Sequence, residues 1–231
     1  MELRLLVLYY SAYGHMHRMC EAAKEGAESV KDVIAVLRRV PETLPQDILE
    51  STGIAQAQKA FAHVPVADLS DFEEADAVLF GVPTRFGNMC AQMRAFLDST
   101  GPLWAKGVLV GKPAGVMTSS ATQHGGQETT IITVMVTLLH HGMILVGLPY
   151  AFNEQVGVDQ VSGCSPYGAS TITGGRGERF PSERELAGAR YQGKYLALVA
   201  WALKERRSKI LDGLFDKGDS GKGDSSPDLS S

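Results

Sequence analysis

The sequence contains little cysteine, with three residues of this type among 231: Cys20, Cys90 and Cys164. These cysteines are far apart and odd in number, and no Cys-x-x-Cys pair occurs, so the sequence predicts neither a metal site nor a disulfide framework. No run of about eighteen apolar residues occurs either, so no membrane-spanning helix is predicted. Because an apolar strand pattern starts at Leu3, we expect no signal peptide and a reduced, cytoplasmic protein.

A strong charge of either sign is also missing. The formal net charge is −4, and no basic region of domain size occurs, which argues against nucleic acid as a partner. Hydrophobic residues make up 44% of the chain and charged residues 21%, which is typical of one globular domain with a substantial core. We assign residues 1–209 to this domain. We predict a disordered tail over residues 210–231, because polar residues and glycine predominate after Phe215.

The N-terminal segment predicts a buried strand, a short loop and a helix. Residues 3–10 are almost all apolar, as in a strand that is covered on both faces of a parallel sheet. The small, hydroxylated loop Ser11–His15 follows, and apolar residues then recur at helical spacing from Met16 to Val30. The free N–H groups at the start of such a helix can bind an anion. An ordinary β–α turn is the alternative interpretation.

Further strands and helices alternate along the chain. The predicted strands span residues 33–40, 77–82, 114–118 and 143–146, and the predicted helices span residues 68–75, 88–101, 128–141 and 182–203. Asn88 is a predicted N-cap, and Ser182 with Glu185 forms a predicted capping box. Residues 41–66 predict a connection with one or two helical turns near Ile54–Phe61, and residues 149–177 show no obvious element. Five buried strands alternating with helices indicate a doubly wound α/β sheet.

Three loops rich in small, hydroxyl and amide residues must meet at one edge of this sheet. They are Ser11–Met16, Pro83–Asn88 and Ser119–Gly126, and each follows a predicted strand. In doubly wound sheets the ligand lies outside the carboxyl ends of the strands. The convergence of the three loops therefore predicts a ligand site at that edge.

Missing residues exclude several ligands of this fold class. The lysine-containing Walker sequence for a nucleoside triphosphate is absent, and so is the GxGxxG sequence of a dinucleotide-binding domain. The acidic residues that a receiver domain needs after the first and third strands are replaced by Tyr9-Tyr10-Ser11 and Pro83-Thr84-Arg85. FMN fits better. Backbone amides and the hydroxyl groups of Ser11 and Tyr13 would hold its phosphate, and its ring would lie between the other two loops.

At these loops the chain resembles the WrbA family of flavodoxin-like NAD(P)H:quinone oxidoreductases. The resemblance covers about residues 3–203 and is carried by YYSAYGH, RRVPET, GVPTRFGNM, QMRAFLD, GQET, HHGM, SPYGA, PSERE and ARYQG. It implies a flavodoxin-like sheet of five parallel strands in the order 2-1-3-4-5, bound FMN and a homotetramer. It also implies two-electron ping-pong reduction of quinones by NADH or NADPH, with nicotinamide and quinone using one pocket in turn. Nothing in the sequence favours NADH over NADPH.

The resemblance also implies site residues by matching position. Ser11–Met16 would hold the FMN phosphate, and Tyr13 and Trp104 would line the nicotinamide and quinone pocket. His140 would be catalytic and reach the flavin from a neighbouring helix or subunit. The third loop reads SSATQHGGQE, where many relatives have a loop richer in glycine and threonine. The residues implied for FMN are Ser11, Ala12, Tyr13, Gly14, His15, Met16, Pro83, Thr84, Arg85, Phe86, Gly87, Asn88, Ser119, Ser120, Ala121, Thr122, Gln123, His124, Gly125 and His140.

Structural roles compete with several of these assignments. His140 and His141 lie about 100° apart on one predicted helix, so only one of them can face a given site. Trp104 is the kind of aromatic residue that also packs in a core or a subunit interface. Arg85 is a surface charge in the alternative interpretation. As site residues, His140 and Arg85 would stabilise negative charge on the reduced flavin.

Two other classes of function stay open from the sequence. A flavodoxin-type one-electron carrier would keep the same fold, but such carriers present a strongly acidic face, whereas the flavin loops here contain Arg85 and histidines. A non-enzymatic regulatory protein would keep the fold without the flavin, and the three intact loops argue against it. Among enzymes, reduction of azo or nitro compounds is a neighbouring activity of reduced flavin.

Overall fold

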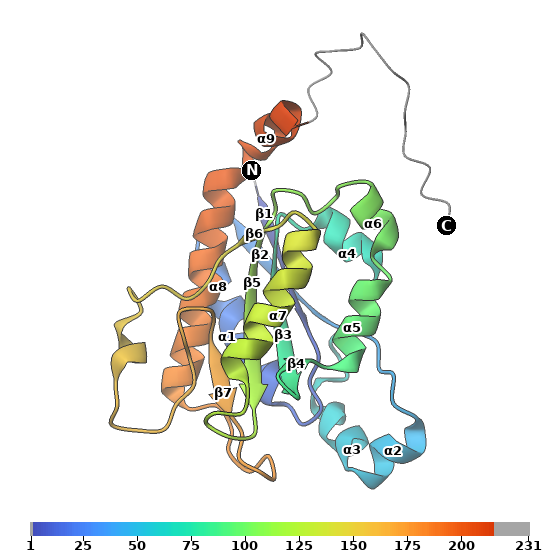
Figure 1. Cartoon of the computed structure of the whole chain (residues 1–231), viewed down its shortest axis with the longest axis vertical. Coiled ribbons are helices and arrows are strands. Elements are labelled where there is room, and N and C mark those ends of the chain that lie inside the picture. Colours follow the sequence, from blue (N-terminus) through green and yellow to red (C-terminus); the bar gives the residue numbers. More distant parts are fainter. Residues whose placement is uncertain (1, 215–231) are drawn as a thin grey trace.

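A parallel sheet runs through the centre of the chain, whose computed structural model describes residues 2–214 (Figure 1). Helices cover both of its faces. The strands are β1 (Leu3–Tyr9), β2 (Val33–Arg39), β3 (Ala77–Arg85), β4 (Asn88–Met89), β5 (Pro113–Ser120), β6 (Ile144–Leu145) and β7 (Ser170–Ile172). The helices are α1 (His15–Glu28), α2 (Gln46–Ser51), α3 (Ile54–Gln58), η1 (Lys59–Phe61), α4 (Leu69–Glu74), α5 (Ala91–Asp98), α6 (Gly101–Ala105), α7 (Gln127–His140), η2 (Asn153–Val156), α8 (Glu183–Lys204) and α9 (Arg207–Leu214).

The strand order β2-β1-β3-β5-β6 confirms the predicted flavodoxin-like fold. These strands are parallel neighbours, and they occupy the predicted positions in the order 2-1-3-4-5. The fifth position is divided between two segments, because β6 pairs with the start of β5 and β7 pairs with its end. In addition, β4 forms an antiparallel pair with β3. The sheet therefore has seven strands in the described residues, where five were predicted.

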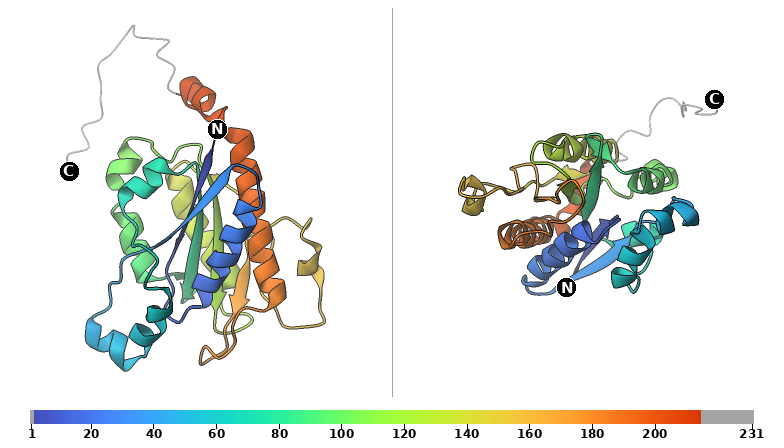
Figure 2. Two further views of the ribbon diagram at one scale, coloured as in Figure 1. Left: turned by 180° about the vertical axis from the view of Figure 1, so that it is seen from behind. Right: turned by 90° about the horizontal axis from the view of Figure 1, so that it is seen from below.

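The apolar run in β1 contributes to the core on both faces of the sheet. Alternate residues pack in two separate apolar clusters, as expected because successive side chains of a strand point to opposite faces. One cluster lies between the sheet and helices α1 and α8, and the other lies between the sheet and helices α4, α5 and α7 (Figure 2). The predicted burial of this strand on both faces is confirmed. The first cluster contains Leu3, Leu5, Val7 and Tyr9, and the second contains Leu6, Leu8 and Tyr10.

The predicted N-cap at Asn88 is wrong. Asn88 lies in β4 opposite Arg85, and Cys90 occupies the N-cap position of α5. The physical reason is a tight reversal after β3, where Phe86 and Gly87 have φ values of 53° and 76°. Because the chain turns back to pair with β3, helix α5 starts only at Ala91.

Two segments without a clear sequence pattern contain short elements. The connection over residues 41–66 holds α2 as well as α3 and η1, and the last two cover the predicted turns at Ile54–Phe61. The segment over residues 149–177 holds η2 and β7. Strand β7 is short and has no distinctive sequence pattern. It is a strand because it pairs in parallel with residues 118–120 of β5.

The C-terminal part of the described chain consists of α8 and α9. The predicted capping box is confirmed, because the Ser182 hydroxyl accepts from the Glu185 N–H and the Glu185 carboxylate accepts from the Ser182 N–H. Helix α9 runs past the predicted domain boundary at residue 209, so residues 210–214, the start of the predicted disordered tail over residues 210–231, are helical instead. The rest of that predicted tail lies outside the described residues. Within residues 2–214, no helix combines the length and apolarity that crossing a membrane requires.

Candidate functional site

A cavity of about 270 Å³ lies at the carboxyl edge of the sheet. Helices α1 and α7 begin at this edge, and β4 and β7 lie there as well (Figure 1). All three predicted loops contribute to its wall, and so does a fourth segment after β7. Because the strands are parallel, their carboxyl ends meet at this edge. The lining residues are Ser11, Ala12, Tyr13, His15, Met16, Pro83, Thr84, Arg85, Ser119, Ser120, Ala121, Thr122, Gly125, Thr173, Gly174, Gly175 and Gly177.

The first loop presents backbone N–H groups to the cavity. Gly14 is the N-cap of α1 with a φ of 92°, a conformation that favours glycine, and no side chain caps the helix. The N–H of Gly14 donates to the Ser11 hydroxyl over 3.0 Å, which closes the turn. Helix α1 therefore starts at the cavity, so its first-turn N–H groups and the positive end of its dipole lie beside the cavity. This arrangement suits an anion.

The side chains of this loop are held by contacts outside it. The Nε2 atom of His15 lies 3.0 Å from the carbonyl oxygen of Gly177, and burial lowers the pKa of His15 below its usual value. The Tyr13 hydroxyl donates to the carbonyl of Thr52 over 3.3 Å, and the Tyr13 side chain is 45% exposed at the rim. Because burial favours the neutral form of His15, positive charge on this loop comes mainly from the helix terminus.

The second loop contributes Pro83, Thr84 and Arg85 to the cavity. The Thr84 hydroxyl pairs with the hydroxyl of Thr130 on α7 over 2.5 Å, which ties this loop to the helix. The Arg85 guanidinium donates to the carbonyl of Thr84, and its side chain is exposed. Three predicted site residues of this loop, Phe86, Gly87 and Asn88, form the reversal between β3 and β4 and do not line the cavity; the ring of Phe86 is fully exposed.

The third loop is tightly folded around Gly125. A Cβ atom added there would lie 2.7 Å from the Thr122 hydroxyl oxygen, so a larger residue requires the loop to shift. The Ser120 hydroxyl donates to the carbonyl of Thr122 over 2.7 Å. Gln123 and His124, which the sequence also predicts as cofactor ligands, line a neighbouring cavity of about 380 Å³ instead.

Sequence reasoning missed the fourth segment of the wall, Thr173–Gly177. Four of its residues line the cavity, and it follows β7 directly. A usable signal is present in the sequence, since Gly174-Gly175-Arg176-Gly177 stands between a short β-branched stretch and the capping box at Ser182. Such a glycine-rich loop follows the carboxyl end of a strand, and doubly wound sheets bind ligands at the carboxyl ends of their strands.

Two predicted site residues, Trp104 and His140, lie elsewhere in the chain. Both line a cavity of about 470 Å³ between α5, α6 and α7, and the indole N–H of Trp104 donates to the carbonyl of His140 over 3.0 Å. Helix α6 lies at the opposite end of the molecule from β4 and β7 (Figure 1). The structure brings these two residues to each other but not to the carboxyl-edge cavity of the same chain.

The carboxyl-edge cavity suits FMN in its donors. Hydroxyl groups of Ser11, Thr84, Ser119 and Ser120 match a ribityl chain, and the start of α1 matches a phosphate monoester. Among the described residues, no aspartate or glutamate lines the cavity. The lack of a side chain at Gly125 also keeps the third loop compact.

Comparisons with known proteins identify the family of this chain. Residues 12–157 match the model of the NADPH-dependent FMN reductase family. The NAD(P)H dehydrogenase (quinone) of Geobacter metallireducens is 63% identical over 202 residues, which are 87% of this chain and 100% of that protein, and the Geobacter sulfurreducens protein of the same name is 63% identical over 198 residues, or 86% and 98%.

Solved structures place the fold in the same group. A WrbA-like flavodoxin from Agrobacterium tumefaciens superposes with a TM-score of 0.62 at 25% identity, covering 87% of this chain and 99% of that one. A flavodoxin from the domain Archaea superposes with a TM-score of 0.56 at 18% identity over 86% and 99% of the two chains, which supports the fold alone. The chain therefore belongs to the NADPH-dependent FMN reductase family and, within it, to the WrbA-like NAD(P)H dehydrogenases (quinone).

Proposed function

We propose that this protein is an FMN-dependent NAD(P)H:quinone oxidoreductase that reduces quinones by two electrons in a ping-pong cycle. The observation that carries the proposal is the carboxyl-edge cavity, where loops with hydroxyl groups and free backbone amides meet the start of α1. Relatives that are 56–63% identical over 86–89% of the chain are named NAD(P)H dehydrogenase (quinone).

The chain supplies binding and orientation, and bound FMN would supply the transfer of two electrons from NAD(P)H to a quinone. In the proposed arrangement, the backbone of Ser11–Met16 holds the phosphate. Hydroxyl groups of Thr84, Ser119 and Ser120 bind the ribityl chain. Tyr13, at the rim, borders the place that nicotinamide and quinone occupy in turn. Arg85 adds positive charge near this edge and favours anionic groups in the cavity.

We also propose that four copies of the chain assemble, and that Trp104 and His140 complete the site of another subunit. Helix α7 exposes Ile132, Val136 and Leu139, at 42%, 50% and 57%, on one apolar stripe. Such stripes on exposed helices are typical of protein interfaces. In the adjoining cavity, the buried Nδ1 atom of His141 has no hydrogen-bond partner among the described residues. A covering subunit would shield the stripe and supply a partner for this nitrogen.

The substitution Trp104→Ala tests this assembly. Loss of an aromatic contact at the substrate pocket should raise the quinone KM about tenfold, while the FMN dissociation constant stays within about twofold of the wild-type value. Steady-state kinetics and flavin titration measure the two quantities, and light scattering measures subunit number. Wild-type values for both constants would mean that Trp104 only packs against α7.

The activity itself is tested on purified protein with added FMN under anaerobic conditions. We expect the flavin absorbance to bleach on addition of NADH or NADPH and to recover fully on addition of benzoquinone. Bleaching by one nucleotide alone would identify the preferred donor. Flavin binding without bleaching by either nucleotide would favour an electron carrier, and failure to bind FMN would contradict the proposed function.

We further propose that the protein functions in the cytoplasm. Its three cysteines are free, and two of them, Cys20 and Cys90, are buried in the core, as is usual in a reducing compartment. Cell fractionation with antibody detection tests this location, and recovery of the protein outside the cytoplasmic fraction would contradict it.

A further inference from the structure

The segment Thr173–Gly177 forms a wall of the flavin cavity that the three predicted loops do not account for. It begins where β7 ends, and Thr173 fixes it to the neighbouring strand: the Thr173 N–H and hydroxyl both donate to the carbonyl of Ser120, over 2.8 and 3.3 Å. Because Ser120 belongs to the third loop, one end of the segment is fastened to the part of the site expected to hold the ribityl chain.

The other end of the segment reaches the first loop. The Gly177 carbonyl lies 3.0 Å from Nε2 of His15, the first residue of α1. The ring of His15 also stacks on Phe180, with ring centres 4.9 Å apart and planes inclined by 22°. The segment therefore spans from Ser120 to the start of α1, which places it beside the expected phosphate position.

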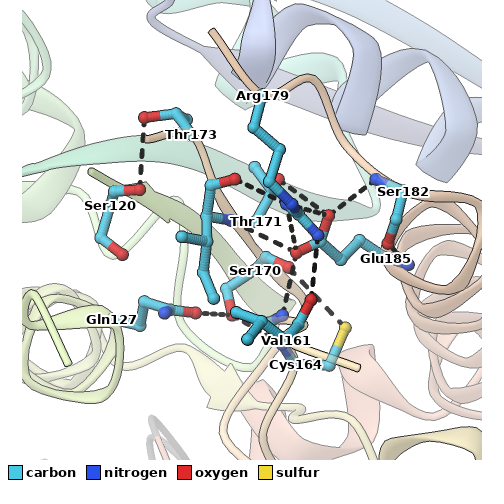
Figure 3. Close-up of polar contacts among 12 residues, drawn as sticks. Ser120, Gln127, Val161, Cys164, Ser170, Thr171, Thr173, Arg179, Ser182 and Glu185 are labelled. Atoms are coloured by element: carbon cyan, nitrogen blue, oxygen red, sulfur yellow. Dashed lines mark hydrogen bonds and ion pairs between the residues drawn. The ribbon is translucent and has the colours of Figure 1, made fainter. Parts of the chain in front are cut away.

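An ion pair between a half-buried arginine, Arg179, and a buried glutamate, Glu185, holds the two ends of this segment in place (Figure 3). The Glu185 carboxylate is fully buried and accepts from the Arg179 guanidinium over 2.9 and 3.0 Å. Arg179 also donates from its backbone N–H to the carbonyl of Thr173 and from its side chain to the carbonyl of Ile172. Charge-assisted hydrogen bonds to a buried carboxylate restrict the positions of their donors. The ion pair therefore holds Arg179 beside Ile172 and Thr173, where the segment begins.

The middle of the segment presents only backbone to the cavity. Gly174 has a φ of 80°, which strains any other residue, and a Cβ atom added there would displace the Glu178 carboxylate. A Cβ atom added at Gly175 would meet no atom within 4 Å. Among the described residues, the N–H groups of Gly174 and Gly175 have no hydrogen-bond partner. Two N–H donors without partners at a cavity wall resemble the backbone nests that bind anions.

We propose that Thr173–Gly177 is a fourth flavin-binding loop, whose glycine N–H groups bind the phosphate end of FMN, and that the Arg179–Glu185 pair positions it. This inference rests on the proposed function, because it takes FMN as the ligand. Gly174 and Gly175 bind through backbone atoms, whereas Arg179 and Glu185 act only through the loop, since their side chains are occupied with each other.

The sharpest test compares Gly175→Asp with Gly175→Asn in the full chain freed of flavin. The two side chains have nearly the same size, and a Cβ atom added at Gly175 meets no atom within 4 Å, so the pair isolates charge. A carboxylate beside the phosphate should weaken FMN binding on the order of tenfold relative to the asparagine variant, by Coulomb repulsion. Riboflavin lacks the phosphate, so its affinity should be equal in the two variants. Fluorescence titration measures all four dissociation constants.

The outcomes separate this inference from the proposed function. If the wild-type chain does not bind FMN, the proposed function fails. If it binds FMN but the two variants have equal FMN affinity, or if riboflavin discriminates between them as FMN does, the fourth loop does not contact the phosphate. As a control for folding, both variants should have the same midpoint temperature of thermal unfolding as the wild-type chain.

The positioning role of the ion pair has its own variants. Arg179→Ala should lower the affinity for FMN several-fold more than the affinity for riboflavin, and it should abolish the protection from hydrogen exchange that FMN gives to the amides of residues 173–177. The control is Arg184→Ala, which removes an ion pair between α8 and Asp159 without a contact to the loop. If Arg179→Ala loses affinity equally for FMN and riboflavin, or if FMN still protects the amides of residues 173–177, the ion pair supports folding in general and does not position the loop.

Discussion

The two edges of the sheet each carry a cavity of similar volume, about 270 Å³ at the carboxyl edge and about 290 Å³ at the amino edge, but their chemistry is opposite. The carboxyl-edge cavity is lined by glycines and hydroxyl groups, with Arg85 as the one lysine or arginine among its described lining residues. The amino-edge cavity lies between α4, the start of β5 and the end of α8. Its charged and polar lining residues are Lys112, Lys204, Arg207, Glu73, Glu74, Asp76 and Ser208.

The cations at the amino edge are engaged by the chain itself. The Lys112 ammonium donates to the carbonyls of Phe72 and Glu73 over 2.7 and 3.1 Å. Arg207 donates to the carbonyls of Val108 and Val110. The Phe72 and Glu73 carbonyls belong to the last turn of α4, where no intrahelical donor follows. The Val108 and Val110 carbonyls lie in the turn between α6 and β5. The charged side chains of the amino-edge cavity are thus held by partners within the chain, whereas the proposed flavin site at the carboxyl edge depends on backbone donors of the start of α1.

The largest expected effect concerns Lys112 and should be confined to stability. Burial lowers the pKa of Lys112 from 10.5 to about 8 in the folded chain. Between these two pH values the unfolded chain binds more protons than the folded chain, so the free energy of unfolding gains a contribution that rises with pH. We expect the wild-type protein to gain up to about 3 kcal/mol relative to Lys112→Met as the pH rises from 8 to 10.5.

Urea unfolding of both proteins across this pH range measures the difference, in which the other titrating groups cancel. FMN affinity of Lys112→Met at neutral pH should stay within about twofold of the wild-type value, because the two edges do not share contacts. If the difference in unfolding free energy between the two proteins does not change with pH, the pKa of Lys112 is not lowered in the folded chain. A large loss of FMN affinity would break the separation between the two edges.

Matched glycines at the two edges give the next test. Gly14 and Gly111 have φ values of 92° and 74°, and a Cβ atom added at either meets no atom closer than 3.7 Å, so backbone strain is the main cost of a methyl group. Both Gly14→Ala and Gly111→Ala should lower the free energy of unfolding by about 1 kcal/mol. Only Gly14→Ala should weaken FMN binding, by about tenfold, because it moves the start of α1.

Denaturant unfolding and flavin titration on the two variants measure both quantities. Equal FMN affinity in Gly14→Ala and Gly111→Ala, at comparable stability, would show that the turn at Gly14 does not shape the phosphate site. A loss of FMN affinity in both variants would show that strain at either edge spreads through the sheet.

The same contrast explains how much of the fold the sequence predicted. Segments with a strong pattern of their own were predicted well, such as the apolar run that became β1 and the capping box at Ser182 that starts α8. Elements defined by partners were not. Strand β7 exists because it pairs with the end of β5, and Asn88 entered a strand because Phe86 and Gly87 reverse the chain. Neither pairing is visible in local spacing.

The candidate site divides in a similar way. The sequence places Ser11, Thr84 and Ser119 after three strands, and parallel topology alone brings them to one cavity. It does not show which residues of each loop turn outward, so Gln123 and His124 fall in a neighbouring cavity. The segment Thr173–Gly177 is added by a strand of three residues and is held by a side chain, Glu185, whose capping pattern in the sequence gives no sign of its contact with Arg179.

The smallest expected effect concerns one cation in the wall of each cavity, Arg85 and Lys204. The Arg85 side chain is exposed and donates to the carbonyl of Thr84, so its attraction for an anion is screened by solvent. Arg85→Ala should therefore weaken FMN binding only about threefold, and the loss should shrink as salt is added. Lys204→Ala removes an ion pair with Asp76 at the other edge and should leave FMN affinity unchanged at every salt concentration. Flavin titration at low and high ionic strength distinguishes the two. If Arg85→Ala leaves FMN affinity as unchanged as Lys204→Ala does, the carboxyl edge attracts the phosphate through backbone donors alone. Charged side chains would then contribute to stability at the amino edge and to ligand binding at neither edge.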